Sequence, residues 1–330
     1  MKSSDTVFII NPASSKGANL LKWDRLKRPL QEKLNLEKIN EHFTTSEDYG
    51  RGYVKEVIQS GVKNIIVFGG DGTLSEVVQG IYENDKLIAN DISLGLIPAG
   101  RGNDFYRSVS KEIKNTQAKS PVDIISLGNK KKIDIARITY YKDGNIINNN
   151  KNYFINIASF GYSGLLVQKV HSENKSTIMN ALTKTSFSYL AQTLPTMSEY
   201  QAVAADVYVD GQECYSGNVY LGLILNGMYN AGGICWSRST KLDDGKFDFV
   251  LFKDLGTLKN LKTMSMALIN GWNEHSNYIY KRASNIKIKF NPENQKKHPY
   301  FEIDGDQDEN EIADMFELSL LPSQVDFFWS

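Results

Sequence analysis

The sequence lacks several features that would indicate common protein classes. Its 330 residues include two cysteines, Cys214 and Cys235, which are too few for the disulfide framework of a small secreted domain. Lysine and arginine together number 38, as do aspartate and glutamate, so no positive excess indicates a nucleic-acid partner. The four histidines do not have the spacing of metal ligands. We therefore expect neither a disulfide scaffold nor a histidine metal centre, and no nucleic-acid partner.

Two further absences concern nucleotide motifs and membrane segments. No G-x-x-x-x-G-K-[ST] motif occurs, which excludes a P-loop, and Gly100-x-Gly102 lacks the third glycine of a dinucleotide fingerprint. The first apolar run, Thr6–Ile10, is far too short for a signal-peptide core or a membrane span. We expect a cytoplasmic protein with no transmembrane segment, and the sequence leaves open whether it forms a homodimer.

Strand and helix patterns alternate in the first part of the chain, from residue 5 to about residue 108. Strands are expected at 7–10, 65–68 and 92–97, an extended piece at 41–45, and helices at 17–34, at 53–58 and after Thr73. Strands that alternate with helices of this length predict βαβ units. The first part is therefore expected to be a three-layer α/β domain with a parallel sheet.

After Pro121 the pattern changes to alternating or β-rich runs separated by Gly and Asn turns. These runs lie at 132–141, 153–159, 202–210, 217–226, 247–252, 285–290, 300–303 and 316–322. They predict a mainly antiparallel second domain, interrupted by helical patterns at 178–194 and 258–270. We place the first domain at 1–125, with 322–330 returning to it, and the second at 126–321.

The most informative stretch is Gly69-Gly70-Asp71-Gly72-Thr73, which follows the apolar strand 65–68 and precedes a helix. Ligands of open α/β sheets bind at the carboxyl ends of strands, and helix N-termini favour anions, phosphate above all. Glycines allow a ligand to approach the backbone closely. On spacing alone, a phosphate site with Asp71 aimed into it and a plain turn with Asp71 or Thr73 as helix cap are equally well supported.

Two other glycine-containing loops follow strands of the first domain. Asn11-Pro12-Ala13-Ser14-Ser15-Lys16-Gly17 offers hydroxyl and amide groups, with Lys16 as a point charge for phosphate. Pro98-Ala99-Gly100-Arg101-Gly102-Asn103-Asp104 has Asn103 and Asp104 where they can cap the next helix. Each loop alone fits a simple strand-to-helix connection. Loops at the ends of neighbouring strands would converge on one crevice.

Two acidic segments lie in the second domain. Strand alternation puts Glu302, Asp304 and Asp306 on one face unless Gly305 breaks the pleat, and paired carboxylates suit a general base or a metal site. A solvated acidic turn is the alternative, since acidic residues continue after Asp306. The loop 241–247 (KLDDGKF) fits turn chemistry or a site for a hard cation.

Together these segments resemble the catalytic domain of the diacylglycerol kinase family, in its soluble bacterial lipid-kinase branch, which includes kinases of diacylglycerol and sphingosine type. The matching pieces are Asn11-Pro12-x-Ser14, Gly69-Gly70-Asp71-Gly72-Thr73-Leu74, Pro98-x-Gly100-x-Gly102-Asn103-Asp104-Phe105, Leu242-Asp243-Asp244-Gly245 and Asp304-Gly305-Asp306. They occur in the family's order over nearly the whole chain. Gly-Gly-Asp-Gly-Thr alone is weak, because NAD kinases and phosphofructokinases share it.

The resemblance implies a phosphofructokinase-like α/β domain, a C-terminal β-sandwich domain, and ATP bound in the cleft between them. The residues that it assigns to ATP are Asn11, Pro12, Ser14, a threonine of the pair Thr44-Thr45 (Thr45 in our assignment), Gly70, Asp71, Gly72, Thr73, Glu76, Arg101 and Asn103. Asp71 would act on the phosphates through Mg²⁺, and Asp244 with the carbonyl groups of Lys241 and Lys246 would hold a structural Mg²⁺.

The resemblance also implies a reaction. Asp306, supported by Asp304, would accept the proton of a lipid hydroxyl as that hydroxyl attacks the γ-phosphate in line. The lipid, diacylglycerol or a related amphiphile, would be reached by peripheral association with the membrane surface. Its pocket is expected near residues 156–165 and 178–194.

Two residues differ from the family pattern. Asp306 replaces the usual glutamate, so its carboxylate reaches roughly 1.5 Å less far, and Arg101 replaces a small hydroxyl residue. These differences motivate one alternative, a nucleotide- or lipid-binding regulator that has lost catalysis. The shared Gly-Gly-Asp-Gly-Thr motivates another, an NAD kinase.

Overall fold

The computed structural model describes the chain except residues 46–47, 49, 114–117, 119, 148, 174–195, 197–198, 271–274, 291–299, 308–312 and 330. The expected helix at 178–194 lies outside the described residues. The chain divides into two compact units, one formed by Met1–Ile135, Leu242–Asp244 and Leu321–Ser330, the other by Ala136–Lys241 and Gly245–Leu320. The sequence-based boundary after residue 125 falls inside a helix, Pro121–Leu127.

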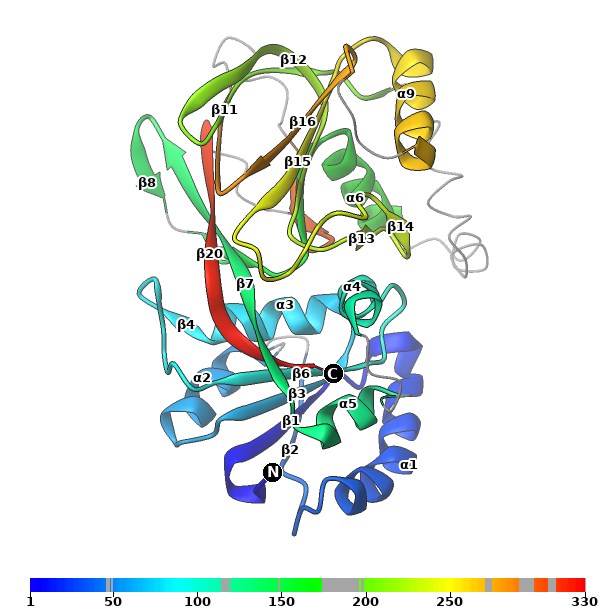
Figure 1. Cartoon of the computed structure of the whole chain (residues 1–330), viewed down its shortest axis with the longest axis vertical. Coiled ribbons are helices and arrows are strands. Elements are labelled where there is room, and N and C mark those ends of the chain that lie inside the picture. The colour runs from blue at the N-terminus through cyan, green and yellow to red at the C-terminus, as the bar shows by residue number, and fades with distance from the viewer. Residues whose placement is uncertain are drawn as a thin grey trace. The chain divides into compact units, whose positions relative to one another are not determined.

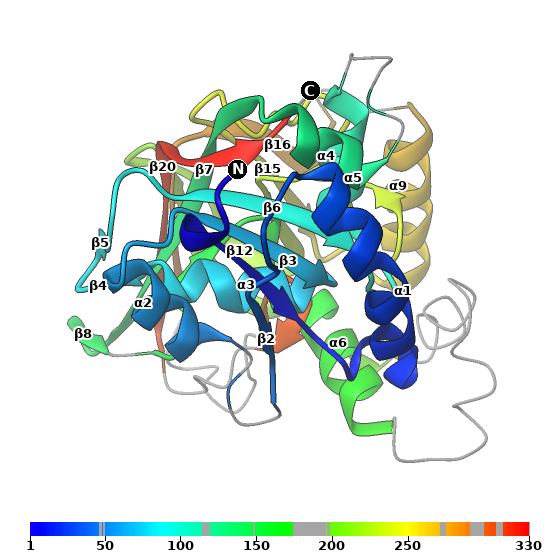
Figure 2. The same cartoon turned by 90° about the horizontal axis from the view of Figure 1, so that it is seen from below.

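The first unit contains a parallel sheet with helices on both faces (Figures 1 and 2). In chain order its elements are β1 (Thr6–Ile10), α1 (Ala18–Lys33), β2 (Glu41–Phe43), α2 (Arg51–Gln59), β3 (Asn64–Gly69), α3 (Asp71–Gly80), β4 (Tyr82–Glu83), β5 (Lys86–Leu87), β6 (Ser93–Pro98), α4 (Asp104–Glu112) and α5 (Pro121–Leu127), with short 3₁₀ turns at Ser3–Asp5 and Ser14–Gly17. The strand order is β6-β3-β1-β2, and all these pairs are parallel. The expected parallel α/β domain is confirmed.

Alternating side chains of the central strands explain the three layers. Phe8 and Phe68 point to the face on which Trp23 and Leu30 of α1 and the apolar residues of α5 pack. Trp23 is fully buried there, with its ring centroid 5.6 Å from that of Phe8. The helices α2 and α3 lie on the opposite face (Figure 2). Burying each such large side chain contributes about 1.5–3 kcal/mol, so both helix layers are held to the sheet mainly by apolar contact.

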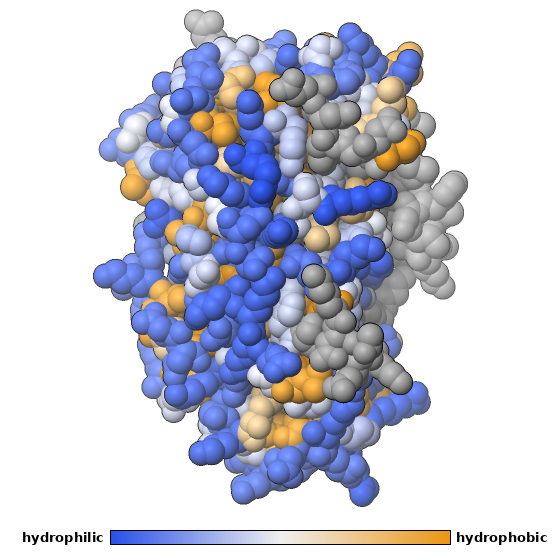
Figure 3. Space-filling view, in the orientation of Figure 1, coloured by the Kyte–Doolittle hydropathy of each residue, from blue (hydrophilic) through white to orange (hydrophobic). Residues whose placement is uncertain are grey.

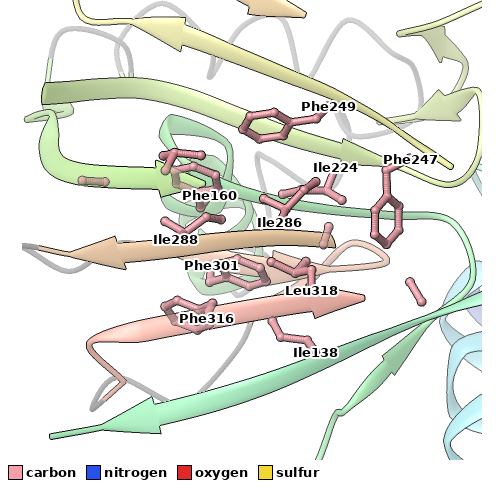
Figure 4. Close-up of a cluster of buried hydrophobic side chains, with 14 of the residues drawn as sticks. Ile138, Phe160, Ile224, Phe247, Phe249, Ile286, Ile288, Phe301, Phe316 and Leu318 are labelled. Atoms are coloured by element: carbon pink, nitrogen blue, oxygen red, sulfur yellow. The ribbon is translucent and has the colours of Figure 1, made fainter. Parts of the chain in front are cut away.

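The second unit is mainly antiparallel, as expected. The first residues of β7 and the last residues of β20 belong to the first unit. With these two strands, the elements of the second unit are β7 (Lys130–Lys142), β8 (Asn145–Ile147), β9 (Tyr153–Phe154), β10 (Ile157–Gly161), α6 (Tyr162–Glu173), β11 (Val203–Val209), β12 (Gln212–Leu225), β13 (Tyr229–Asn230), β14 (Ile234–Cys235), β15 (Phe247–Lys253), α9 (Thr257–Asn270), β16 (Tyr278–Ala283), β17 (Asn285–Phe290), β18 (Phe301–Ile303), β19 (Asp306–Gln307) and β20 (Met315–Phe328). Strands β18, β10, β12, β11 and β17 follow one another in the sheet, and each neighbouring pair is antiparallel. Their inner faces share a core rich in phenylalanine (Figure 4).

The last strand, β20, is longer than the sequence indicated. The pattern suggested an end at Pro322, but the strand continues to Phe328, and its last residues pair in parallel with β6 at Asp326↔Ser93. Ser323 adopts a left-handed conformation (φ 52°) just after the proline, and its N–H donates to Asp134 at 2.7 Å. The strand therefore continues through Pro322 and Ser323 instead of ending there. Residues 321–330 belong to the first unit.

No helix among the described residues is long and apolar enough to cross a membrane.

Candidate functional site

Three loops of the first unit meet at one edge of its sheet. They follow β1, β3 and β6, whose carboxyl ends lie side by side because the strands are parallel neighbours. The backbone N–H of Asn11, after β1, donates to Phe68 O at 3.1 Å, and that of Ala99 donates to Gly69 O at 2.7 Å. The convergence that the sequence pattern predicted is therefore present in the structure.

Two glycines let the second and third loops touch through their backbones. A Cβ atom added to Gly100 would lie 2.4 Å from Gly70 Cα, and one added to Gly70 would lie 2.9 Å from Gly100 Cα. Neither distance is compatible with a side chain. The loops thus form a surface of bare backbone next to the first turn of α3, which fits the close approach of a phosphate group.

Asp71 connects these two loops. Its Oδ2 accepts a hydrogen bond from Asp104 N and its Oδ1 one from Phe105 N, both at 3.0 Å. The sequence offered a cap of its own helix or a role toward phosphate. The side chain instead holds the first turn of another helix, α4, and the role toward phosphate stays a prediction.

Asn11 connects the first loop to α3. Its Oδ1 accepts hydrogen bonds from Ala13 N at 3.0 Å and Ser14 N at 3.1 Å, and its Nδ2 donates to Thr73 Oγ1 at 2.9 Å. Three predicted site residues, Asn11, Ser14 and Thr73, are therefore brought together. Pro12 follows Asn11 directly, in the same half-buried turn.

Asn19 is a residue of this edge that the sequence analysis missed. It is fully buried in α1, and its Nδ2 donates to Asn11 O at 3.3 Å and to Ala99 O at 3.0 Å, joining the first and third loops. An asparagine in the first turn of an otherwise amphipathic helix was the available signal. Its buried amide holds the loops in place.

The third loop is closed by Asn103. This residue is left-handed (φ 51°), and its side chain accepts from Gly100 N at 2.9 Å and donates to Gly100 O at 3.1 Å. Between them Arg101 is exposed, as is Gly72 in the second loop. Asn103 therefore shapes the loop, and the Arg101 side chain is directed to solvent.

Glu76 and Thr45 are engaged with neighbouring loops. Glu76 Oε2 lies 2.9 Å from Arg51 Nη2, at the start of α2. Thr45 Oγ1 accepts from Asp48 N at 3.0 Å, whereas Thr44 is buried, with its N–H donating to Ile10 O at 2.9 Å. Of the two threonines, Thr45 is the exposed one. Both contacts order the segment after β2, beside the end of β1.

The predicted structural Mg²⁺ ligands lie in the loop between β14 and β15. Asp244 is half-buried, and its neighbour Asp243 pairs with Lys131 at 2.9 Å, while Leu242 O accepts from Asp134 N at 2.7 Å. Lys241 is exposed, and Lys246 Nζ lies 3.7 Å from Asp210 Oδ2. Among the described residues, no three side chains of His, Cys, Asp or Glu are grouped as for a metal ion. A Mg²⁺ held by one carboxylate with carbonyl oxygens and water, as predicted here, does not require such a group.

In the second unit the pleat breaks at Asp304 and Gly305, which have φ angles of 51° and 86°. Asp304 accepts three backbone hydrogen bonds, from Asn156 N at 3.0 Å, Ile157 N at 3.1 Å and Ile155 N at 3.2 Å. Its carboxylate therefore fixes the chain before β10 and positions the turn that carries Asp306. The single face of three carboxylates that unbroken alternation would give does not form.

Asp306 pairs with a lysine that the sequence analysis missed. Its Oδ2 lies 2.6 Å from Lys151 Nζ, and 40% of the Asp306 side chain is exposed. The lysine comes from a loop more than 150 residues earlier, so no local pattern pointed to it. The predicted general base thus has one oxygen engaged by an ammonium group.

Glu302 is the more deeply buried of two buried carboxyl groups in this hairpin, the other being Asp304. It is 1% exposed, its Oε1 accepts from Ser159 Oγ at 2.5 Å, and its Oε2 accepts from Gly305 N at 3.1 Å. Burial raises the pKa of Glu302 to about 7, with a further upward contribution from the charges of Asp304 and Asp306. Such a carboxyl exchanges its proton near neutral pH, which the sequence could not reveal.

Comparison with known proteins agrees with the motifs and the fold. Residues 5–138 match the family model of the diacylglycerol kinase catalytic domain. The chain is 29% identical over 291 residues to a diacylglycerol kinase of Staphylococcus saprophyticus, covering 85% of this chain and 83% of the relative. It is 27% identical over 247 residues to a diacylglycerol kinase of Bacillus subtilis, covering 75% and 74%.

A crystal structure of a diacylglycerol kinase from Bacillus anthracis has a similar fold, with a TM-score of 0.66 and 19% identity over 99% of this chain and 97% of that one. The matched domain contains all three loops that meet at the sheet edge. Through residues 5–138 the chain therefore matches the catalytic domain of the diacylglycerol kinase family, and the relatives that it resembles are named as kinases of that type.

Proposed function

We propose that this protein is an ATP-dependent lipid kinase that transfers the γ-phosphate of ATP to a hydroxyl group of diacylglycerol or a related lipid. The observation that carries the proposal is the joining of three loops at one sheet edge by Asp71 and Asn11, within the domain that matches the family. The match of residues 5–138 to the family model supports kinase activity and the use of ATP. The names of the relatives support a diacylglycerol-like acceptor.

In this proposal the nucleotide phosphates bind the bare backbone of the Gly70 and Gly100 loops and the first turn of α3. The residues that would hold the nucleotide are Asn11, Pro12, Ser14, Thr45, Gly70, Asp71, Gly72, Thr73, Glu76, Arg101 and Asn103. ATP supplies the phosphoryl group, and Mg²⁺ bound with it neutralises charge on the phosphates. Asp71 would act on these groups through Mg²⁺ and water while it holds α4, because a carboxylate oxygen accepts more than one hydrogen bond and water can donate one of them. A second, structural Mg²⁺ would bind Asp244 and the carbonyl groups of Lys241 and Lys246.

The acceptor hydroxyl has to lose a proton as its oxygen attacks phosphorus. Asp306 is the family-position candidate for the proton acceptor, and Asp304 holds the turn on which Asp306 stands. The ion pair with Lys151 keeps the Asp306 carboxylate in a fixed place. It also engages one of the two oxygens that could accept the proton.

A lipid acceptor requires contact with a membrane surface, and we propose that α9 of the second unit provides it. Leu258 and Ile269 are 83% and 76% exposed and share one helix face with Lys262, since they lie four and seven positions from it. Orange atoms mark hydrophobic residues where Figure 1 places α9 (Figure 3).

The helix has exposed lysines at 259 and 262 and no acidic residue, which suits the anionic headgroups of a cytoplasmic membrane surface. We therefore propose a cytoplasmic protein that associates with the membrane peripherally.

Purified protein incubated with ATP, Mg²⁺ and a panel of lipids in mixed micelles tests the proposed function. The expected product is a lipid phosphate monoester, with ADP formed in equal amount. The same assay with NAD as acceptor tests the NAD kinase alternative. Folded, nucleotide-binding protein that phosphorylates none of the lipids would contradict the proposal.

A second candidate function is a nucleotide- or lipid-binding regulator without turnover, which the engagement of Asp306 by Lys151 favours. Replacing Asp306 by glutamate restores the family's chain length at this position. If the wild-type protein is inactive and Asp306→Glu gains turnover, the regulator is the correct assignment. Activity of the wild-type protein excludes it.

A further inference from the structure

A chain of three hydroxyl and carboxyl groups leads from the interior of the second unit toward its surface. Ser159 of β10 lies directly opposite Glu302 of β18 in the antiparallel register, and their side chains meet at 2.5 Å. Ser163, in the first turn of α6, lies 2.5 Å from Ser159 through its Oγ. Glu302 and Ser159 are 1% and 0% exposed, whereas Ser163 is half-buried.

The direction of these hydrogen bonds follows from the number of protons. A serine hydroxyl has one proton to donate, and Ser159 donates it to the Glu302 carboxylate. The bond between the two serines must then be donated by Ser163. Ser163 Oγ keeps its acceptor capacity for one more hydroxyl group, which can come from outside the protein.

Glu302 is surrounded by groups that keep it able to accept a proton. Asp304 and Asp306 on its own hairpin are negatively charged and disfavour its ionised form. Ser159, Gly305 N and, at 3.5 Å, Asn230 Nδ2 donate to it from β10, the turn and β13, and favour the ionised form. The ammonium group of Lys151 is paired with Asp306. Because these effects oppose one another, Glu302 is the buried carboxyl of the cluster that can take up and release a proton.

We propose that Glu302, reached through Ser159 and Ser163, takes up the proton that the acceptor hydroxyl loses during phosphoryl transfer. The inference rests on the proposed function. Ser163 is the residue that contacts the acceptor, and Glu302 and Ser159 act through it. Asp306 then orients the acceptor while bound to Lys151, which explains how the chain functions with a shortened residue at the family's position.

In the proposed step, a proton moves from the acceptor to Glu302 while the phosphoryl group moves from ATP to the acceptor. The acceptor O–H proton passes to Ser163 Oγ, the Ser163 proton passes to Ser159 Oγ, and the Ser159 proton passes to Glu302 Oε1. The acceptor oxygen forms a bond to the γ-phosphorus, the bond from that phosphorus to the β,γ-bridging oxygen breaks, and ADP leaves with the electron pair. Glu302 then returns its proton to water along the same hydroxyl groups.

Three variants test the relay, namely Glu302→Gln, Ser159→Ala and Ser163→Ala. Each is expected to lower kcat by roughly 10²–10⁴-fold with little change in KM for ATP, the contribution usual for proton transfer by a positioned group. Asp306→Asn is expected to lower it less than any of them. Ser216→Ala is the matched control, because Ser216 also donates to a carboxylate, Asp206, at 2.6 Å, but on the exposed surface.

Two readouts separate a relay from a structural role. The kcat of the wild-type protein should rise with pH through about 7 as Glu302 ionises, and this rise should be absent in Glu302→Gln. In the protein without nucleotide, infrared spectra should contain a protonated-carboxyl band that titrates in the same range and is missing from Glu302→Gln. Ser163→Ala, at the half-buried end, keeps the test valid if a buried variant does not fold.

Wild-type kcat and an unchanged pH profile in folded Ser163→Ala and Glu302→Gln would overturn the relay and leave the proposed function intact. A wild-type protein that phosphorylates no lipid would instead contradict the proposed function, and the relay inference with it. The infrared titration does not depend on turnover. An absent band would show that Glu302 is ionised throughout and cannot store the proton.

Discussion

The side chain of Asp71, at the first residue of α3, accepts a 3.0 Å hydrogen bond from the backbone N–H of Asp104, at the first residue of α4. One carboxylate thus joins the first turns of α3 and α4, which follow β3 and β6, across a separation of 33 residues of sequence. The proposed phosphate site depends on this connection, because it sets the distance between the two glycine loops.

Asp71→Ala should therefore weaken both the fold and nucleotide binding. Loss of two hydrogen bonds to a charged group should lower the free energy of unfolding by about 1–3 kcal/mol, measured by denaturant titration. Ser120→Ala is the control, since Ser120 caps α5 in the same unit at 3.2 Å from Asp123 N and lies outside the three loops. It should lose about 1 kcal/mol but bind nucleotide normally. Equal nucleotide affinity in both variants would contradict the role of Asp71.

Gly100→Ala should separate the second and third loops. The added methyl group would lie 2.4 Å from Gly70 Cα, so the backbone has to move, at a cost of about 1–3 kcal/mol in stability. Nucleotide affinity, measured by calorimetry, should fall at least about tenfold, which corresponds to 1.4 kcal/mol. Gly144→Ala provides the comparison, because no atom lies within 4 Å of the Cβ added there, so its cost comes from a left-handed φ (77°) and not from a contact. If both substitutions leave nucleotide affinity unchanged, the glycine contact is not part of the site.

Asp304 and Asp306 should respond differently to the same substitution. Asp304→Asn disturbs three buried backbone hydrogen bonds and should cost about 2–3 kcal/mol of unfolding free energy. Asp306→Asn breaks a half-exposed ion pair with Lys151 and should cost less than about 1 kcal/mol. Thermal and denaturant unfolding of the two variants under identical conditions measures the difference. A larger cost at Asp306 would show that the Lys151 pair, rather than the Asp304 turn, holds the hairpin.

Glu302→Gln should make stability less dependent on pH. The pKa of Glu302 is raised from 4.5 to about 7 in the folded protein, so the folded state binds its proton more tightly than the unfolded state. Its contribution to stability is complete below pH 4.5 and is lost as the pH rises to about 7.

The variant does not lose this stability and should be more stable than the wild type at pH 8. We expect a difference of about 1–2 kcal/mol, because one unfavourable contact of the new amide with Gly305 N–H offsets part of the gain. Denaturant titrations of both proteins at pH 5 and pH 8 give the comparison. A wild type that gains stability relative to the variant as the pH rises would contradict the assignment.

Leu258→Ser combined with Ile269→Ser should reduce membrane association. Both side chains are largely exposed on α9, so the substitutions should leave stability within about 0.5 kcal/mol. Binding to vesicles that contain anionic lipid, measured by sedimentation, should fall several-fold, and it should fall further when Lys259 and Lys262 are also replaced. Ile146→Ser is the control, because Ile146 is 66% exposed on β8. Equal vesicle binding by the control and the α9 variants would exclude α9 as the contact.

Much of the first unit could be predicted because its signals are local. The apolar strands 7–10, 65–68 and 92–97 and their following loops lie where periodicity and glycine placed them. The helix α6 was not predicted, and Gly161 and Gly164 lie at its start. These glycines are required by close contacts with Tyr220 O and Tyr300 O. Contacts of this kind come from distant parts of the chain and leave no local pattern.

In the candidate site, too, contacts with distant residues could not be predicted from the sequence. The sequence identified Asp71 and Asp306 as functional candidates, but their partners Asp104 and Lys151 lie 33 and 155 residues away. The raised pKa of Glu302 arises from burial, and periodicity does not report how deeply a carboxyl lies. The sequence therefore predicted which residue types follow the strands, but it did not predict the hydrogen bonds and ion pairs that these side chains form.

The assignment as a lipid kinase is tested most directly by measuring the transfer of labelled γ-phosphate from ATP to diacylglycerol in mixed micelles, with the product identified by mass spectrometry. The proposed function predicts a lipid that gains one phosphate group, at a rate that depends on Mg²⁺. The proposed relay adds that this rate falls at least about 10²-fold in Glu302→Gln. If folded, nucleotide-binding wild-type protein leaves the acceptor unphosphorylated across the lipid panel, the assignment as a lipid kinase is wrong.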